Sequence, residues 1–186
     1  RLLAGDAMPE AAWLDGVEIQ LAEAGATLAA GRAALIGQLG AELAQLPQEP
    51  FARPRLTYVA GGPLDAAELA AALQAGRSRD RAAQRTLTGP HRDELDVVME
   101  GKGQPAALCS TGEQKAMLIA ITLAHAGLAA GRRPGLLLLD EVAAHLDPLR
   151  RAALFERLRE GGAQVWLTGT ELPPFADIRA EAAVWQ

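Results

Sequence analysis

The sequence predicts an α/β fold with a helical lobe before it. Helix and strand patterns alternate in the second half of the chain, over residues 112–130, 136–139, 148–159 and 164–167, which is typical of a parallel α/β layer. The first half is alanine-rich and mostly helical in pattern. We therefore expect two domains: a helical lobe with a connector at residues 1–85, and an α/β subdomain at residues 86–186.

The first predicted element is a long amphipathic helix from Val17 to Leu46, which Pro47 and Pro50 end. Its apolar residues recur at helical spacing, and they are Ile19, Leu21, Leu28, Leu35, Leu39, Leu43 and Leu46. We expect these residues to form the face that the helix buries.

A short strand and a second helix follow. The strand is predicted at residues 56–59, and Asp65 and Glu68 then have the spacing of a capping box, which begins a helix that runs to residue 75. Gly76 weakens the helical pattern, and we expect an arginine-rich connector after it. Its arginines are Arg77, Arg79, Arg81 and Arg85. They are candidate contacts to DNA phosphate, while the simpler interpretation is a solvated helix face.

The second half opens with a predicted β-hairpin. Its arms at residues 95–99 and 105–108 flank Gly101-Lys102-Gly103, where glycine permits a positive φ. Further on, the four leucines at 136–139 form an apolar run without alternation. Such a run fits a strand that is covered on both faces in the centre of a sheet.

Composition restricts the class of protein. The 186 residues are 49% apolar, enough for one sizeable core, and the net charge of −5 offers no broad attraction to phosphate backbones. The single cysteine excludes an internal disulfide framework. The longest apolar stretch, residues 117–130, is shorter than the roughly 20 residues that span a bilayer, and no signal peptide pattern is present, so we expect a cytoplasmic protein. The chain starts at Arg1 with a helix that no strand precedes, which suggests a fragment or a processed product.

Two carboxylates, Asp140 and Glu141, directly follow the run of leucines. Open α/β sheets bind their ligands at the carboxyl ends of the strands. In a nucleotide hydrolase the first acid would hold Mg²⁺ and the second would orient or polarise the attacking water. The alternative is that an acidic pair simply ends the strand and caps the next turn.

Two further motifs begin helices. Ser110 and Glu113 have capping-box spacing before a long helix, which indicates ordinary helix initiation or, with the nearby glycine and backbone N–H groups, an anion site for a terminal phosphate. Asp147 precedes Pro148 as an N-cap would, so capping explains it without any functional role.

Four ordered segments carry a family resemblance: TLTGPHRDEL, LCSTGEQKAMLIAITLA, LLLLDEVAAHLDPLRRAAL and QVWLTGT. Together they resemble the carboxyl-terminal ATPase part of RecF-like DNA-repair ATPases of the ABC/SMC type. The upstream WLDGVEIQLAEAGATLAAGR resembles the helical second lobe of that family. The resemblance implies the carboxyl-terminal part of an ABC-type P-loop ATPase domain with an attached helical lobe.

The resemblance also implies roles for individual residues. The ABC signature would consist of Ser110, Thr111, Gly112, Glu113 and Gln114, and in a dimer it would contact the γ-phosphate of nucleotide held by the partner subunit. Asp140 would be the Mg²⁺ aspartate and Glu141 the hydrolytic glutamate. Asp147 would belong to the D-loop. ATP and Mg²⁺ are the implied cofactors.

For the intact protein, the resemblance implies a DNA-binding clamp of replication and repair whose dimerisation depends on ATP. It would bind single-strand/double-strand DNA junctions and cooperate with RecR, with RecO in the same pathway, to promote RecA loading. A role as an ABC transporter ATPase half is disfavoured by the GPHRD segment at residues 89–93.

The chain departs from the family pattern in two places. No G-x-x-x-x-G-K-[ST] occurs, so the phosphate cradle is missing and we expect weak or no ATP binding by this chain alone. Where many ABC ATPases have a switch histidine, this chain has Thr168-Gly169-Thr170. We expect a weak ATPase in the intact protein; the alternative is a non-catalytic interaction or regulatory fragment.

The remaining candidates have structural interpretations. Residues 89–93 fit a Gly-Pro turn that enters a strand. His125 is expected on an apolar helix without a metal role, and Cys109 as a small apolar residue. His145 lies near the acidic pair without an identifiable partner.

Overall fold

The computed structural model describes residues 10–47, 49–130, 135–143 and 146–185. The chain forms two compact units, and neither is continuous in sequence. Unit 1 contains Arg1–Gly37 and Leu56–Asp96, and unit 2 contains Gln38–Arg55 and Val97–Gln186. The first helix, α1 (Ala11–Gln45), contributes residues to both units. The predicted domain boundary between residues 85 and 86 remains a prediction, because each compact unit is made of two separate segments of the chain.

Unit 1 is built on close packing between α1 and α2 (Ala66–Ala83). Its buried cluster contains Ala22 of α1 with Leu69 and Leu73 of α2. A Cβ atom added at Gly25 would lie 3.0 Å from a methyl carbon of Leu69. Small residues on α1 thus let α2 approach closely.

The buried face of α1 matches the predicted one only in part, at Leu39 and Leu43. The predicted residues Ile19, Leu21, Leu28 and Leu35 are between 40% and 57% exposed. Those that α1 buries are Leu14, Ala22, Ala29, Leu39 and Leu43. The prediction weighted large apolar residues, whereas the close approach in unit 1 uses alanine and glycine.

The helix α2 extends further than predicted. The Asp65 carboxylate caps it by accepting from the backbone N–H groups of Ala67 and Glu68, as the capping-box spacing indicates. The helix continues through Gly76 and ends at Gln84, whose φ of 56° is left-handed. The expected arginine-rich connector is therefore wrong for three residues that lie inside α2, namely Arg77, Arg79 and Arg81.

Three strands form one sheet in the order β1 (Pro54–Val59), β2 (Glu94–Met99) and β3 (Gln104–Pro105). The antiparallel pairing of β2 with β3 confirms the predicted hairpin. Its second arm is shorter than predicted, because Ala106–Leu108 forms a 3₁₀ helix. The turn places Gly103 at a φ of 59°, which glycine adopts without strain.

Unit 2 contains the predicted alternation of α3 (Thr111–Ala130), β4 (Leu136–Leu139), α4 (Pro148–Glu160) and β5 (Gln164–Leu167). The strands β4 and β5 are parallel. The core includes Ala116, Met117, Ala120, Leu154 and Phe155, each at most 1% exposed. The expected parallel α/β layer is confirmed.

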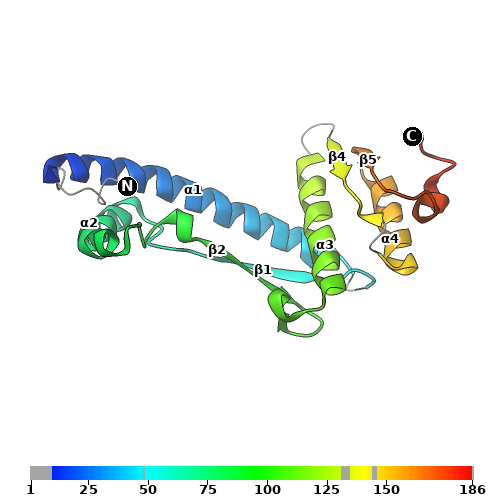
Figure 1. Cartoon of the computed structure of the whole chain (residues 1–186), viewed down its shortest axis with the longest axis horizontal. Coiled ribbons are helices and arrows are strands. Elements are labelled where there is room, and N and C mark those ends of the chain that lie inside the picture. Colours follow the sequence, from blue (N-terminus) through cyan, green and yellow to red (C-terminus); the bar gives the residue numbers. More distant parts are fainter. Residues whose placement is uncertain (1–9, 48, 131–134, 144–145, 186) are drawn as a thin grey trace. The chain divides into compact units, whose positions relative to one another are not determined.

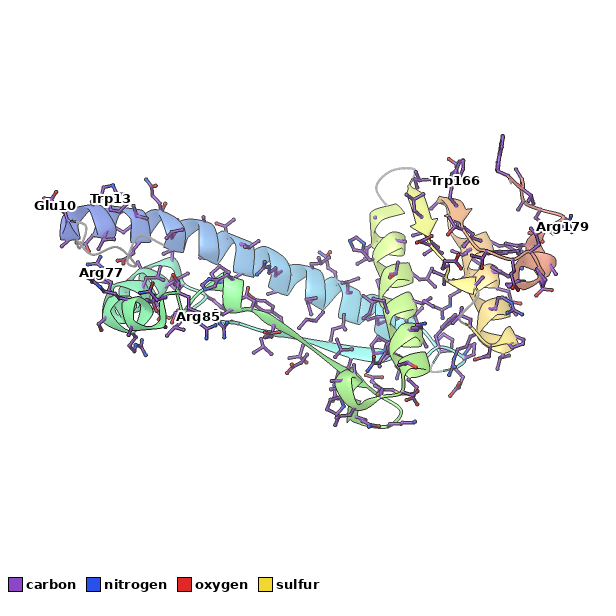
Figure 2. The ribbon with its side chains drawn as sticks, viewed as in Figure 1. Glu10, Trp13, Arg77, Arg85, Trp166 and Arg179 are labelled. Carbon is purple, nitrogen blue, oxygen red and sulfur yellow. The ribbon has the colours of Figure 1, made fainter. Side chains whose placement is uncertain are left out.

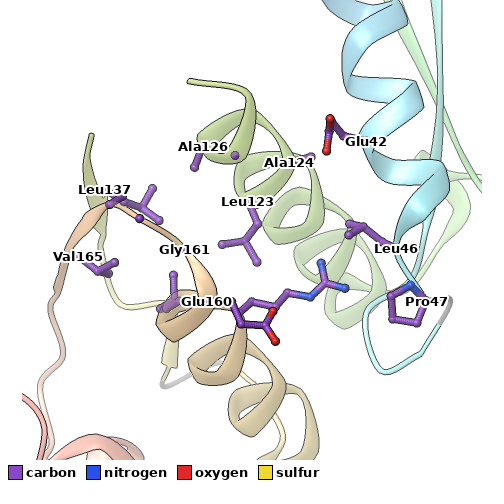
Figure 3. Close-up of a pocket in the computed structure, with 15 residues that line it drawn as sticks. Glu42, Leu46, Pro47, Leu123, Ala124, Ala126, Leu137, Glu160, Gly161 and Val165 are labelled. Atoms are coloured by element: carbon purple, nitrogen blue, oxygen red, sulfur yellow. The ribbon is translucent and has the colours of Figure 1, made fainter. Parts of the chain in front are cut away.

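The two faces of the β4–β5 pair differ in exposure. Leu137 and Val165 line a cavity of about 510 Å³ together with Leu123 of α3 (Figure 3). On the other face, Leu136 is 60%, Leu138 68% and Trp166 50% exposed. The prediction that this strand is covered on both faces is therefore wrong for this chain. The apolar run matches a buried strand, but no described part of the chain covers the second face.

No helix among the described residues is long and apolar enough to cross a membrane.

Candidate functional site

The acidic pair lies where β4 ends. Asp140 is exposed, and Glu141 follows it with a φ of 52°. A residue with a Cβ atom rarely adopts this left-handed conformation, so neighbouring contacts must hold it. The backbone N–H of Thr168 donates to the Leu139 carbonyl oxygen at 3.0 Å and keeps β5 in register with the strand end.

Thr168 contacts both members of the pair. Its hydroxyl accepts from the backbone N–H of Glu141 at 3.1 Å and donates to Asp140 Oδ1. The sequence showed only that Thr168-Gly169-Thr170 stands where many ABC ATPases have a switch histidine. The parallel register Leu139↔Leu167 places Thr168 beside Asp140, and this pairing is the signal that could have found it.

The residues fit a magnesium site of the kind that nucleotide completes. Mg²⁺ prefers oxygen ligands, keeps several waters, and is usually held by one or two carboxylates together with substrate phosphates. Asp140 offers an exposed carboxylate with this character. Among the described residues, no group of three or more His, Cys, Asp and Glu side chains could hold a metal ion.

The turn before α3 is a capping box. The Ser110 backbone N–H and hydroxyl both donate to Glu113 Oε2 at 2.9 Å, and the Glu113 N–H donates back to Ser110 Oγ at 3.3 Å. The Gln114 amide donates to the Ala106 and Cys109 carbonyl oxygens at 2.9 and 3.2 Å. Ser110, Thr111 and Gly112 remain exposed on this fixed turn.

Lys102 from the hairpin turn pairs with Glu113. This ion pair and the two hydrogen bonds from Ser110 lower the pKa of Glu113 to about 2. A carboxylate beside Ser110 would by itself repel a phosphate, and the Lys102 ammonium offsets this charge. In the sequence, Lys102 was notable only as part of the Gly101-Lys102-Gly103 turn, and its ion pair with Glu113 was not predicted.

Asp147 caps α4. Its carboxylate accepts from the Arg150 backbone N–H at 3.0 Å and pairs with the Arg150 guanidinium at 2.9 Å. The Arg150 N–H is the main cause that lowers the pKa of Asp147. Asp147 is exposed, so capping fixes the carboxylate and leaves it accessible. Ala144 and His145 lie outside the described residues.

The residues predicted for the nucleotide site form separate groups in unit 2. Asp140 and Glu141 meet at Thr168, and Ser110 meets Glu113 and Lys102. No described hydrogen bond or ion pair joins the two groups. Figure 1 shows α3 and β4 running in opposite directions, so the start of α3 and the end of β4 face the same end of the unit.

The GPHRD segment is a structural node of unit 1. Pro90–Arg92 forms a 3₁₀ turn that enters β2, as the Gly-Pro pattern indicates. The Asp93 side chain is only 6% exposed. It accepts from the Tyr58 hydroxyl at 2.6 Å, the Gly61 N–H at 2.9 Å and the Arg32 guanidinium at 2.8 Å. One carboxylate therefore joins α1, the end of β1 and the segment before β2.

These contacts shift the pKa values of Asp93 and Tyr58. Burial alone raises the pKa of Asp93, but hydrogen bonds from Tyr58, Gly61 and Arg32 outweigh it, and the pKa lies below its ordinary value. Burial and the hydrogen bond to Asp93 raise the pKa of Tyr58 to about 12. A Cβ atom at Gly61 would lie 2.5 Å from the Arg92 backbone, so only glycine fits this close approach.

The four candidate arginines differ in their contacts. Arg77, which is labelled in Figure 2, donates to Glu18 at 2.8 and 2.6 Å and also pairs with Asp15. These contacts raise its pKa. Arg81 is partly buried. Arg79 and Arg85 are exposed, and within the part of the chain that the structure describes neither has an ion-pair partner.

His125 is exposed on α3, and Cys109 is a buried free thiol whose Sγ lies 3.5 Å from the Pro105 carbonyl oxygen.

Comparisons with known proteins give a consistent result. DNA replication and repair protein RecF of Brucella abortus (strain 2308) is 45% identical over 97% of this chain, which covers 50% of that protein. The protein of the same name from Mesorhizobium japonicum is 45% identical over 91% of the chain, which covers 48% of it. The chain thus spans about half the length of the curated relatives that it matches. No family model matches the chain.

The solved structures show the fold. A structure of the recombination mediator protein RecF-ATPrS in the RecFOR pathway aligns with a TM-score of 0.77 at 20% identity, over 93% of this chain and 49% of that one. A second, of RecF-ATP in the same pathway, aligns with a TM-score of 0.69 at 19% identity. The chain therefore has the mixed helix and sheet fold of about half of each of these structures. By sequence, nearly the whole chain matches about half of proteins that are named DNA replication and repair protein RecF.

Proposed function

We propose that this chain is the carboxyl-terminal part of a RecF protein, a DNA-binding ATPase of replication and recombinational repair. Residues 1–85 would supply the helical lobe, and residues 86–186 the subdomain with the signature, the Walker B acids and the D-loop. The observation that carries the proposal is the acidic pair at the end of a parallel strand, with Thr168 fixing both Asp140 and the backbone of Glu141. Two acids at this place in an α/β sheet suit nucleotide chemistry.

Each acid has a separate role in the proposed reaction. Asp140 binds the Mg²⁺ that accompanies ATP, and Mg²⁺ supplies charge neutralisation at the phosphates. Glu141 orients the water that attacks the γ-phosphorus as the bond to the bridging oxygen breaks, and it accepts the proton of that water. Hydrolysis is weak in the intact protein.

The signature acts on nucleotide held by a partner subunit. Ser110, Thr111 and Gly112 expose a hydroxyl and backbone N–H groups at the start of α3, where the helix dipole favours an anion. Glu113 and Gln114 fix this turn. Asp147 of the D-loop couples the two sites of the dimer. Dimerisation then depends on ATP and hydrolysis releases it.

The biological partners follow from the relatives. The curated relatives are named as DNA replication and repair proteins, and the solved structures as recombination mediators of the RecFOR pathway. We infer that the intact protein acts in the cytoplasm, binds single-strand/double-strand DNA junctions, and cooperates with RecR and RecO to promote RecA loading.

Glu141→Gln in the intact protein tests this function. The glutamine keeps the shape but cannot accept the proton, so hydrolysis falls by about 100-fold or more and an ATP-bound dimer accumulates. Light scattering after size exclusion, with and without ATP and Mg²⁺, measures the dimer. Glu171→Gln, an exposed glutamate in the same unit, is the control. An ATP-independent monomer fraction in both variants contradicts the sandwich mechanism.

For DNA, the structure favours Arg79 and Arg85 over Arg77, whose charge Glu18 and Asp15 already neutralise. Replacing both exposed arginines with alanine lowers the slope of log K against log salt by about 0.9 for each lost contact to duplex phosphate. Titrations of a labelled DNA junction at several salt concentrations measure the slope. Arg159→Ala, an arginine paired with Glu181 in unit 2, is the control. An unchanged slope in the Arg79 and Arg85 variant removes these residues from the DNA surface.

A non-catalytic regulatory role is the second candidate. It is favoured by the lack of a G-x-x-x-x-G-K-[ST] segment in the 186 residues. Mg²⁺-dependent ATP hydrolysis by the intact protein distinguishes the two, because a non-catalytic role predicts no turnover. Micromolar ATP binding by this chain alone in isothermal titration would contradict the need for a phosphate cradle elsewhere.

A further inference from the structure

Thr168 occupies a position that sheet geometry controls closely. It follows β5 directly, and β5 pairs in parallel with β4 up to Leu139↔Leu167. Its backbone N–H continues the ladder by donating to the Leu139 carbonyl oxygen at 3.0 Å. The side chain of Thr168 is therefore held beside the first residues after β4.

The single proton of the Thr168 hydroxyl is used in one hydrogen bond. The hydroxyl donates that proton to Asp140 Oδ1 and accepts the backbone N–H of Glu141 at 3.1 Å. One hydroxyl thus fixes the direction of one carboxylate and the peptide plane that precedes the other. The side chain of Thr168 contacts the two acids, so we expect it to influence a bound ligand through them.

The backbone of Glu141 depends on such a contact. Its φ of 52° is one of two positive values at non-glycine residues in the described chain, and the other, at Gln84, ends a helix. The left-handed conformation is unfavourable for a residue with a Cβ atom unless surrounding interactions hold it. Without the hydroxyl, the peptide is free to turn, and the Glu141 side chain moves with it.

We propose that Thr168 is a positioning residue, whose hydroxyl sets Asp140 for the cation and Glu141 for the attacking water. This inference rests on the proposed ATPase function and extends it to a residue outside the two acids. The feature that supports it is the pair of hydrogen bonds at the shared end of two parallel strands, in which one hydroxyl donates to Asp140 and accepts from the Glu141 N–H.

Three variants of the intact protein test the inference. Thr168→Val keeps the shape and removes the hydroxyl, so kcat for ATP hydrolysis falls by about 10- to 100-fold while KM for ATP changes little. Thr168→Ser restores the hydroxyl and kcat. Thr57→Val, at an exposed threonine of β1 in unit 1, leaves kcat unchanged. If the valine variant does not fold, as judged by circular dichroism, Thr168→Ala takes its place.

Cation binding gives a readout independent of turnover. With a non-hydrolysable ATP analogue present, Mn²⁺ affinity measured by electron paramagnetic resonance falls in Thr168→Val by about 10-fold and recovers in Thr168→Ser. In an Asp140→Asn background, Thr168→Val causes no additional loss of Mn²⁺ affinity, because the carboxylate through which it acts is gone.

The outcomes separate this inference from the proposed function. If Asp140→Asn and Glu141→Gln change neither hydrolysis nor Mn²⁺ binding, the proposed function itself is wrong. If those variants lose activity but Thr168→Val keeps wild-type kcat and Mn²⁺ affinity, the positioning role alone is wrong. A loss that Thr168→Ser does not restore also contradicts it, because the hydroxyl is then not the group that matters.

Discussion

Asp93 and Asp140 both accept a hydrogen bond from a side-chain hydroxyl, yet their surroundings differ. Asp93 in unit 1 is 6% exposed and has three donors, from Tyr58, Gly61 and Arg32. Asp140 in unit 2 is exposed and accepts from Thr168. The first carboxylate has its acceptor capacity used by the fold, whereas the second retains capacity for a cation. The number of hydrogen-bond donors around the carboxylate, more than the presence of an acid, therefore distinguishes the structural Asp93 from the candidate cation ligand Asp140.

The largest effect on stability is expected at Asp93. In Asp93→Asn an amide group faces donors that need an acceptor, so the free energy of unfolding falls by about 2–3 kcal/mol. Urea unfolding followed by circular dichroism measures this change. The control is Asp96→Asn, at an exposed aspartate of β2, which shifts the free energy by less than about 0.5 kcal/mol. An equal fall in the free energy of unfolding in both variants would show that Asp93 is not a structural carboxylate.

The pH dependence of stability provides a second test of the role of Asp93. The pKa of Asp93 is lowered in the folded chain, so its contribution to stability is present above the unfolded pKa of about 3.9 and is lost as pH falls through the folded value. Between pH 7 and pH 3, the wild type therefore loses more stability than Asp93→Asn does. Urea midpoints of both proteins across this range are the measurement, and parallel curves contradict the assignment.

The smallest stability effect is expected at Asp140. Asp140→Asn retains Oδ1 as an acceptor for Thr168 on an exposed residue, so the free energy of unfolding changes by less than about 0.5 kcal/mol. Mg²⁺-dependent ATP hydrolysis by the intact protein is nevertheless lost. The same urea and hydrolysis assays measure both quantities. A destabilisation as large as that of Asp93→Asn would show that Asp140 belongs to the fold.

Local signals in the sequence predicted the elements well. The capping-box spacing of Ser110 and Glu113 gave the start of α3, and the Asp147-Pro148 pair gave the start of α4. Such signals depend on residues three or four positions apart, which the sequence displays directly. The acidic pair after β4 was predictable in the same way.

Contacts between distant segments were not predictable. The Asp93 node joins residues 32, 58, 61 and 93, and the Thr168 contact joins residues 140, 141 and 168. No periodicity encodes such pairings. Helical spacing correctly placed Leu39 and Leu43 on the buried face of α1. It did not predict the part of α1 near α2, where close packing buries Ala22 and leaves Leu21 and Leu28 exposed.

The exposed face formed by Leu136, Leu138 and Trp166 has a spectroscopic consequence. Indole fluorescence shifts to shorter wavelength when the ring leaves water. The other two tryptophans, Trp13 and Trp185, are 48% and 82% exposed and lie away from this pair of strands in the sequence. With both replaced by phenylalanine, the emission of Trp166 becomes an intrinsic optical probe, and its colour reports whether another polypeptide segment has covered this side of the sheet.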